Sequence, residues 1–592
     1  MSVEKLIVDH METWTSALQT RSTAGRGSSG KIDLYGIKKL RELILELAVR
    51  GKLVPQDPND EPASKLLKRI AAEKAELVKQ GKIKKQKPLP EISEEEKPFE
   101  LPEGWEWTRL INLGIWALGS GFPNVVQGST DKEILMCKVS DMNLEGNEKF
   151  IFSTKNTISK DLADEYKIKI SEPGTIIFPK IGGAIATNKR RILVQDTAID
   201  NNCLGIKPCD AISGEWFYLI LNTLDMSKYQ SGTSIPAINQ SVIGSIPIAL
   251  PSLKMQEKIV SYVITLMSLC DQLEQQSLTS LDAHQQLVET LLGTLTDSQN
   301  AEELAENWAR ISEHFDTLFT TEASVDALKQ TILQLAVMGK LVPQDPNDEP
   351  ASELLKRIAQ EKAQLVKEGK IKKQKPLPPI SDEEKPFELP SGWEWCRLGC
   401  IGNPMDSAIV DGPFGSSINT KIDYIDNGCP VTRMGNIRPF EYINENMKYV
   451  TPEKLHLLKR HNILPGDVLM GKVGSIGNAT LYPEYMPEGL IATTGVARFR
   501  VGKIINNKLL CYNINAMAPM LRTIASEAVQ PFLNMKTINN CIIGLPPFNE
   551  QEKIINTLDN LFLVIEQIKS RIQSAQILQL HLADALTDAA IN

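Results

Sequence analysis

The sequence ILELAVRGKLVPQDPNDEPASKLLKRIAAEKAELVKQGKIKKQKPLPEISEEEKPFELPEGWEW at residues 44–107 occurs again at residues 332–395, with nine differences over 64 positions. The two copies match at polar positions, such as those in residues 51–64, as well as at apolar ones. A shared core would need only matching apolar positions and volumes. The duplicated polar surface therefore predicts that the same partner docks twice; the alternative is a duplicated domain that serves only stability.

A second, shorter repeat lies out of phase with the first. The pattern Pro-x4-Gln-Glu-Lys-Ile occurs at residues 251–259 and again at residues 546–554. Each copy opens a long run in which apolar residues recur every three or four positions, as far as Leu295 and Leu586. This spacing predicts a long helix in each copy, either as an amphipathic helix or as part of an antiparallel coiled coil. A helix over residues 256–295 would be ~60 Å long.

The order of these pieces predicts a circular arrangement. The chain runs through a repeat, a variable stretch, a long helix and an acidic linker at about 297–325, and then through a repeat, a variable stretch and a helix again. From Pro251 to Trp393 there are 142 positions, and joining the chain ends gives 151 from Pro546 to Trp105. Because the two paths are nearly equal, we expect neighbouring termini and an approximate two-fold axis.

The two variable stretches, residues 108–250 and 396–545, consist of short β-like runs separated by Gly and Pro. They differ in sequence but share landmarks, for example PGTIIFPKIGG at 173–183 and PGDVLMGKVGS at 465–475. Each landmark is typical of a turn, a buried strand and a glycine-rich turn that carries one lysine. The stretches are therefore predicted to be two copies of one α/β fold with different surfaces.

These patterns predict an α/β (α+β) fold class, with twisted β-sheets in two domains that the long helices separate. The predicted regions are residues 1–107, conserved and helical with the first repeat; 108–250, the first variable domain; 251–395, conserved, with a spacer helix, the linker and the second repeat; 396–545, the second variable domain; and 546–592, the C-terminal spacer helix.

Composition indicates a cytoplasmic protein. Nine cysteines are scattered without a C-x-x-C pair or a nearby histidine cluster, which is typical of reduced thiols and not of a zinc site or a disulfide framework. No run of ~18 apolar residues occurs, and the first residues lack the apolar run of a signal peptide. We therefore expect no membrane association and no metal bound by this chain.

The net charge of −8 does not exclude nucleic-acid binding, because phosphate binding needs local rather than global positive potential. Residues 108–248 have 14 basic and 14 acidic side chains, and residues 396–543 have 15 and 11. The excess of acidic residues therefore lies outside the two variable stretches.

Together with GPFGSS at 412–417, PGDVLMGKVGS at 465–475 and the two Pro-x4-QEKI segments, this order of pieces resembles the specificity subunits of type I restriction-modification systems, most closely the IB-type subfamily. The likeness covers essentially the whole chain. It implies that the variable stretches are target recognition domains for a bipartite, asymmetric site in double-stranded DNA. Two nearly identical repeats that carry different variable domains suit such a site, since each half of the site has its own hydrogen-bond donors and acceptors in the major groove.

The resemblance also implies that partners perform the chemistry. The repeats would bind two methyltransferase (modification) subunits, which use S-adenosylmethionine to methylate adenine. Restriction subunits, which use ATP and magnesium, would join this core. The chain itself would bind no cofactor and would have no catalytic residue, as in a non-catalytic DNA-recognition subunit.

Two other functions remain alternatives from the sequence. One is a protein-interaction scaffold with duplicated docking blocks and no DNA reading, which the balanced charge of residues 108–248 allows. The other is an autonomous enzyme. The segment from Gly466 to Lys472 resembles a phosphate loop, but Val473 stands where the magnesium-binding hydroxyl belongs, so a strand and turn is the better interpretation.

Nine residues are candidate DNA contacts, because Arg can bond guanine through two donors and Lys can contact phosphate. The alternative for each is a surface position that touches no DNA, and residues 412–415 could be a turn that only shapes the fold. The candidates are Lys180, Lys189, Arg190 and Arg191 in the first variable domain, and Ser416, Ser417, Arg433, Arg438 and Lys472 in the second.

Overall fold

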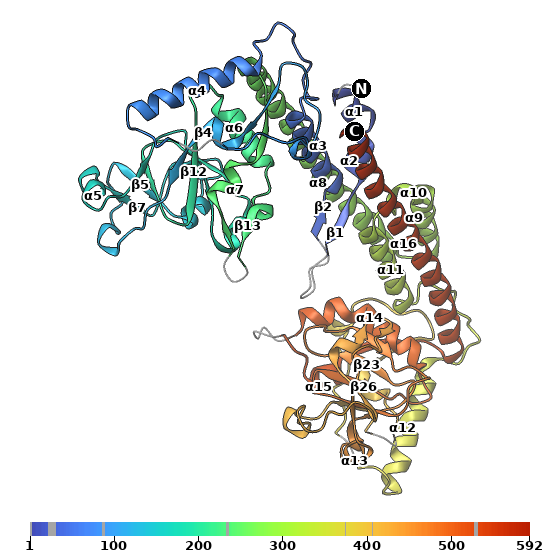
Figure 1. The fold of residues 1–592 in the computed structure, drawn as a ribbon. Helices are drawn as coiled ribbons and strands as arrows, with labels where there is room; N and C mark the ends of the chain where they lie inside the picture. Colours follow the sequence, from blue (N-terminus) through green and yellow to red (C-terminus); the bar gives the residue numbers. More distant parts are fainter. Residues whose placement is uncertain are drawn as a thin grey trace. The chain divides into compact units, whose positions relative to one another are not determined.

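The computed structural model describes residues 3–21, 31–85, 89–232, 236–372, 375–404, 407–525 and 531–591. The chain forms two compact units (Figure 1). Unit 1 consists of Met1–Gln19, Leu34–Ser277 and Leu578–Asn592, and unit 2 consists of Thr20–Asp33 and Leu278–Ile577. Each unit therefore has one copy of the long repeat, one variable domain and a part of each long helix. We call the variable domains the first head and the second head.

The helices of the first repeat form the start of unit 1. Four of the seven buried residues of α3, Leu40, Leu43, Ile44 and Leu47, recur at helical spacing on its inner face. The helix stops at Gly51, whose φ of +69° suits glycine and whose missing side chain leaves room for Trp105. The bounds are α1 (Val3–Asp9), α2 (Met11–Ser16), α3 (Tyr35–Val49) and α4 (Ala63–Lys79), with short strands β1 (Gln19–Arg21) and β2 (Lys31–Asp33).

The first head has two sheets whose central strands are buried on both faces, as β5 and β9 show by four consecutive buried residues each. One sheet has the order β4 (Gly114–Leu118), β12 (Cys203–Pro208), β9 (Ile176–Pro179), β10 (Arg191–Leu193) and β6 (Phe150–Ile151). The other has the order β7 (Asn156–Ile158), β5 (Ile134–Cys137), β11 (Thr197–Ile199) and β8 (Ile170–Ser171). Helices α5 (Lys160–Glu165), α6 (Gly214–Thr223) and α7 (Gln240–Gly244) complete the head, with the small pair β13 (Gln230–Ser231) and β14 (Ala237–Ile238).

The second head repeats this topology. One sheet has the order β17 (Ile409–Asp411), β26 (Val496–Phe499), β23 (Val468–Gly471) and β24 (Ala479–Leu481). The other has the order β21 (Lys448–Val450), β18 (Cys429–Thr432), β25 (Gly489–Ile491) and β22 (Asn462–Ile463). The helices are α13 (Pro452–Leu457), α14 (Asn507–Thr523) and α15 (Met535–Asn540), and β19 (Ile437–Arg438) pairs with β20 (Glu441–Tyr442). The heads share a parallel pair, β5 with β11 in the first and β18 with β25 in the second, and the first head has a further parallel pair, β10 with β6. The prediction of one α/β fold used twice is confirmed.

Each head is attached to its unit by a pair of antiparallel strands. In unit 1, β3 (Glu106–Arg109) pairs with β15 (Pro247–Leu250), and in unit 2, β16 (Glu394–Arg397) pairs with β27 (Ile542–Leu545). The chain therefore enters and leaves each head through two adjacent strands.

The two predicted long helices are α8 (Leu253–Asp297) and α16 (Phe548–Ile591), with 45 and 44 residues. The first part of α8 belongs to unit 1 with the end of α16, and the remainder of α8 belongs to unit 2 with the start of α16. This pattern is that of an antiparallel pair. The repeat contributes a third helix, since Arg41 of α3 pairs with Asp271 of α8 at 2.7 Å and Lys39 of α3 pairs with Asp584 of α16 at 3.3 Å.

The segment predicted as an acidic linker at about 297–325 is largely helical. Asn300 accepts a hydrogen bond from the Glu303 backbone amide and starts the first of these helices, and Ile311, Leu318 and Phe319 are buried in the core of unit 2. The many acidic residues of this segment obscured the apolar face of its helices in the sequence. The helices here and in the second repeat are α9 (Ala301–Glu313), α10 (Phe315–Leu318), α11 (Glu322–Val337) and α12 (Ala351–Lys367).

The two ends of the chain meet in unit 1, as the repeat order predicts (Figure 1). The Tyr35 hydroxyl donates a hydrogen bond to the Asp584 carboxylate at 2.7 Å, and the Lys52 amine donates to the carbonyl of Ile591 at 2.6 Å. The end of α16 thus packs on the helix that starts the first repeat.

Candidate nucleic-acid interface

The glycine-rich turn with one lysine has the same backbone in both heads. The Lys180 amide donates to Asn202 and the Lys472 amide donates to Gly495, at 2.9 and 2.8 Å. The carbonyls of the same lysines accept from Ile238 and Leu533, at 2.8 and 3.0 Å. The predicted correspondence of residues 173–183 with 465–475 is therefore confirmed.

The side chains of the two lysines differ in their surroundings. Lys472 is 5% exposed, and its amine pairs with Asp411 at 2.6 Å. Strand register places Leu118 of the first head at the position of Asp411. Lys180 is half-buried, and within the described part of the chain its amine has no hydrogen-bond or ion-pair partner. The first head therefore offers a cation at this turn, whereas the second head neutralises it internally.

The cluster that follows the turn in the first head is only partly available for contacts. Arg190 is 1% exposed and donates to the carbonyls of Asn188 and Leu224, and burial lowers its pKa to about 10. This arginine holds the head together, so the expectation that it contacts DNA is corrected. Lys189 and Arg191 are half-buried and reach across to Asn143 and to the carbonyl of Met142.

A short turn that those side chains approach is also built alike in the two heads. The Lys138 amide donates to the Asp141 carboxylate at 2.8 Å, and the Arg433 amide donates to the Asn436 side chain at 2.9 Å. Sequence reasoning selected Arg433 but missed Lys138, although KVSD at 138–141 and RMGN at 433–436 occupy corresponding places in the two variable stretches. The Lys138 amine donates a hydrogen bond to the side-chain oxygen of Gln127 at 2.6 Å.

The other candidates in the second head are scattered. Arg433 donates to the carbonyl of Asn446, and Arg438 is exposed at the end of β19. The Ser417 amide donates to the Phe414 carbonyl at 2.8 Å, which makes residues 414–417 a tight turn, and Phe414 is 79% exposed. The side chain of Ser416 lies outside the described residues. Lys472, buried and paired, is no longer a candidate contact, in contrast to the expectation.

The heads are fastened to the repeats by one arginine each. Arg109 donates to Glu96 at 2.5 Å and to the carbonyl of Ser245 at 2.7 Å. Its counterpart Arg397 donates to Glu384 at 2.9 Å and to the carbonyl of Asn540. The guanidinium of Arg109 lowers the pKa of Glu96 to about 2. Each arginine, itself part of the first attachment strand, thus ties a loop of the repeat to the residue that lies two positions before the second attachment strand.

The surroundings of Trp105 and Trp393, which occupy the same position of the two repeats, differ in the hydrogen-bond acceptor of the indole. Trp105 and Trp393 are both 7% exposed, and their indoles donate to Gln56 at 2.8 Å and to Glu550 at 3.1 Å respectively. In the shorter repeat, Met255 stands in the first copy where Glu550 stands in the second. Burial raises the pKa of Glu550, which is 1% exposed.

Neither a metal site nor a membrane segment is present among the residues that the structure describes. No group of three or more His, Cys, Asp and Glu side chains there could hold a metal ion. No described helix combines the length and the apolar content needed to cross a bilayer. All nine cysteines have free thiols.

Comparison with known proteins identifies the repeated domain. The family of the type I restriction modification DNA specificity domain matches residues 132–283 and 415–576. The chain is 52% identical to the type I restriction enzyme EcoAI specificity subunit of Escherichia coli and 49% identical to the EcoEI specificity subunit of the same species. Both matches cover 100% of this chain and 100% of the relative.

Two solved structures are more distant. The first, described as the structural basis of complex assembly and conformational transition of the type I R-M system, has 18% identity and a TM-score of 0.44, over 84% of this chain and 99% of that one. The HsdS subunit from Thermoanaerobacter tengcongensis has 18% identity and a TM-score of 0.39, over 83% and 98%.

Proposed function

Since the chain belongs to the family of type I restriction-modification specificity subunits, we propose that each of its two heads reads one half of a bipartite, asymmetric DNA site. The observation that carries this proposal is one head fold built twice, with matching backbone and different side chains. The pair Lys180 and Lys472 is the clearest case, because the same turn presents an open amine in one head and a neutralised amine in the other. Two such heads suit two unlike sequences.

The proposed contacts follow from exposure. Among the candidate residues, the charged side chains that keep some access to solvent are Lys180, Lys189 and Arg191 in the first head, with Lys138 as an addition, and Arg433 and Arg438 in the second. Ser417 at the edge of the 414–417 turn is a further proposed contact. Lysine contacts to phosphate would position the heads, and arginine contacts to base edges would supply sequence information.

The partners complete the proposed enzyme. Two methyltransferase subunits would dock on the two repeats, which match in polar as well as apolar positions. They would methylate adenine with S-adenosylmethionine, and restriction subunits would use ATP and magnesium. The specificity subunit would bind the site and bring those subunits to it, with no cofactor of its own. Its two Escherichia coli relatives are likewise specificity subunits of type I restriction enzymes.

Methylome sequencing of cells with the complete system tests the proposal. We expect one methylated motif with two unlike halves and a fixed gap, and its loss when this chain is deleted. The purified complex should bind that motif with a steep salt dependence, because lysine and arginine contacts to phosphate release counterions. A motif that persists without the chain, or affinity for DNA that does not depend on salt, would contradict it.

A further inference from the structure

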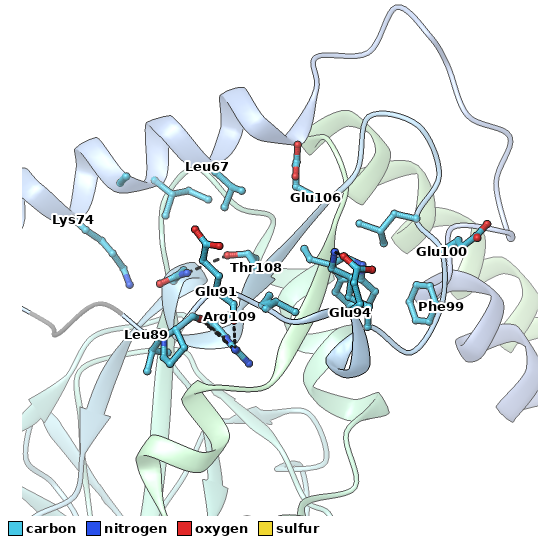
Figure 2. A pocket seen from close by; sticks show the side chains of 18 residues that line it. Leu67, Lys74, Leu89, Glu91, Glu94, Phe99, Glu100, Glu106, Thr108 and Arg109 are labelled. Atoms are coloured by element: carbon cyan, nitrogen blue, oxygen red, sulfur yellow. Dashed lines mark hydrogen bonds and ion pairs between the residues drawn. The ribbon is translucent and has the colours of Figure 1, made fainter.

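We propose that the groove between α4 and the loop of residues 89–101 receives an extended segment of the methyltransferase subunit that carries apolar and basic side chains. We call this loop the strap. The groove, whose lining side chains Figure 2 shows, has a volume of about 1130 Å³, and none of those residues is among the proposed DNA contacts. The inference rests on the proposed function and names the surface through which that function recruits its partner.

The floor of the groove is apolar and firmly built. Leu67 of α4 faces the strap residues Leu89 and Phe99 across it, and Trp107 of β3 lines the same space (Figure 2). The rings of Phe99 and Trp107 pack at 5.0 Å between centroids, and the Arg50 guanidinium lies 5.0 Å from the Phe99 ring. Leu89 remains 38% exposed. Apolar side chains that are held in place and still open to water are the usual core of an interface.

The rim of the groove is acidic in effect, because its basic groups are already engaged. The Lys74 amine donates to the carbonyl of Ile111 at 2.5 Å, Lys97 pairs with Glu94 at 2.5 Å, and Arg109 is bonded to residues of the strap. In contrast, Glu100 and Glu106 are exposed and, within the described residues, have no ion-pair partner. Such a rim repels phosphate and favours a segment with lysine or arginine.

The second repeat preserves this chemistry. Fourteen of the 18 residues that line the groove are identical at an offset of 288, including the counterparts of both open carboxylates, Glu388 and Glu394. The packing is also matched. Phe387 and Trp395 lie 5.1 Å apart, and Lys362 donates to the carbonyl of Cys400 at 3.0 Å. Matching apolar and acidic residues at these positions of both repeats fit one partner that docks twice, whereas a surface for reading DNA would differ between the two halves.

Charge reversal at the two rims provides the test. The variants are Glu100→Lys with Glu106→Lys in the first repeat, Glu388→Lys with Glu394→Lys in the second, and all four together. The matched control is Glu103→Lys, an exposed carboxylate next to the groove that does not line it and that the second repeat replaces with Ser391. Native mass spectrometry of the chain mixed with its methyltransferase subunit counts the bound copies, and circular dichroism verifies folding.

We expect two methyltransferase copies per chain in the wild type and in the control, one copy in either rim variant, and none in the combined variant at the same concentration. Each rim variant should lose at least tenfold in affinity for one copy. Two bound copies in the combined variant would overturn the groove as the docking site. Absence of any complex with the wild type would instead contradict the proposed function, so the two failures are distinguishable.

Discussion

At the scale of single residues, Glu550 is a buried carboxyl group at a position where the first copy of the fold has a methionine. Its Oε1 atom accepts from Trp393 at 3.1 Å and from Gln344 at 3.2 Å, whereas Oε2 has no hydrogen-bond partner among the described residues. An unsatisfied buried polar atom costs about 1–3 kcal/mol. In the first copy Gln56, the counterpart of Gln344, accepts from Trp105, so Gln344 can accept from Trp393 once Glu550 is replaced. We therefore expect Glu550→Met to raise the melting temperature of unit 2 by roughly 2–4 °C at pH 8, measured by calorimetry.

The pH dependence of this gain follows from the raised pKa of Glu550. Protonation favours the folded state, so the penalty from Glu550 is absent below the usual carboxyl pKa and grows as the pH rises through the raised value. The advantage of Glu550→Met should thus shrink at pH 5. Met255→Glu in unit 1 should have the opposite effect on stability. An equal gain at both pH values would show that the carboxyl charge is not the cause.

Arg109 predicts a local effect on the strap. Lysine has the charge of arginine but cannot reach Glu96 and the carbonyls of Pro90 and Ser245 together. We expect Arg109→Lys to destabilise the attachment by about 2 kcal/mol and to increase trypsin cleavage within residues 89–101 at least fivefold. Because the pKa of Glu96 is lowered to about 2, its contribution is present above pH 4.5 and is lost as the pH falls toward 2.

Arg397→Lys is the matched control for that experiment, since it should loosen only residues 377–389 of the second repeat. Cleavage products are separated by mass spectrometry. Equal cleavage of residues 89–101 and residues 377–389 in either variant would mean that the arginines act on global stability and do not fasten individual loops.

The open amine of Lys180 gives a third prediction at this scale. We expect Lys180→Met to weaken DNA binding by the assembled complex three- to tenfold and to reduce the salt slope by about one, because one phosphate contact is lost. Lys472→Met should leave the slope unchanged but lower the stability of the second head, since Asp411 loses its partner. Fluorescence anisotropy at several salt concentrations measures the slope. Equal slopes for Lys180→Met and the wild type would remove Lys180 from the DNA interface.

The same pair of lysines shows why the head surfaces could not be predicted fully. The turn itself was predictable, because Pro, Gly and the apolar run are local signals. Burial of Lys472 depends on Asp411, which is 61 residues away in the sequence and adjacent only after β17 and β26 pair. Arg190 likewise depends on the carbonyl of Leu224, which is 34 residues away. Nothing in the local sequence distinguishes a cation that contacts DNA from one that supports the fold.

At the scale of elements, the long helices could be predicted because their apolar spacing persists over more than ten turns. The segment at 297–325 could not, because its helices are short and its acidic residues conceal the apolar face around Ile311. The groove was also missed. Its lining comes from α4, the strap and β3, and their packing appears only in three dimensions.

The helices predict how the gap in the DNA site is set. Inserting seven residues into both α8 after Ser277 and α16 after Ile577 lengthens each helix by ~10 Å and keeps its apolar face in phase. At ~3.4 Å per base pair, we expect the unread gap to grow by about three base pairs. Methylome sequencing reads the new motif. An insertion in α8 alone should reduce methylation instead, because the two helices no longer match. An unchanged gap in the double insertion would show that the length of the helices does not set the gap.

At the scale of the whole molecule, the two heads have the same fold and are connected to their units in the same way. The chain enters and leaves each head through one antiparallel strand pair, with Glu106 opposite Leu250 and Glu394 opposite Leu545. The second head also packs on the helices of its unit through α14, where the Gln334 amide group of α11 donates to the carbonyl of Ala516 at 2.9 Å. One arginine per head fastens that pair to its repeat. A head can therefore be exchanged at these strands. Exchange of residues 108–250 leaves 15 of the 18 residues that line the groove in place and supplies Arg397 for Arg109, while Cys396 and Cys400 replace Thr108 and Asn112.

Replacing residues 108–250 with a copy of residues 396–545 gives a chain with two second heads, for which the modular construction predicts a symmetric site. Only the half read by the first head should change, and it should become a second copy of the other half. If the two-fold relation expected from the repeat order holds, the halves form an inverted repeat. The reciprocal chain, with two first heads, should yield the complementary inverted repeat. Methylome sequencing of cells with either chain tests both expectations. Changes in both halves of the motif would show that the heads do not read DNA independently. A direct repeat would exclude the two-fold relation but would remain consistent with independent reading.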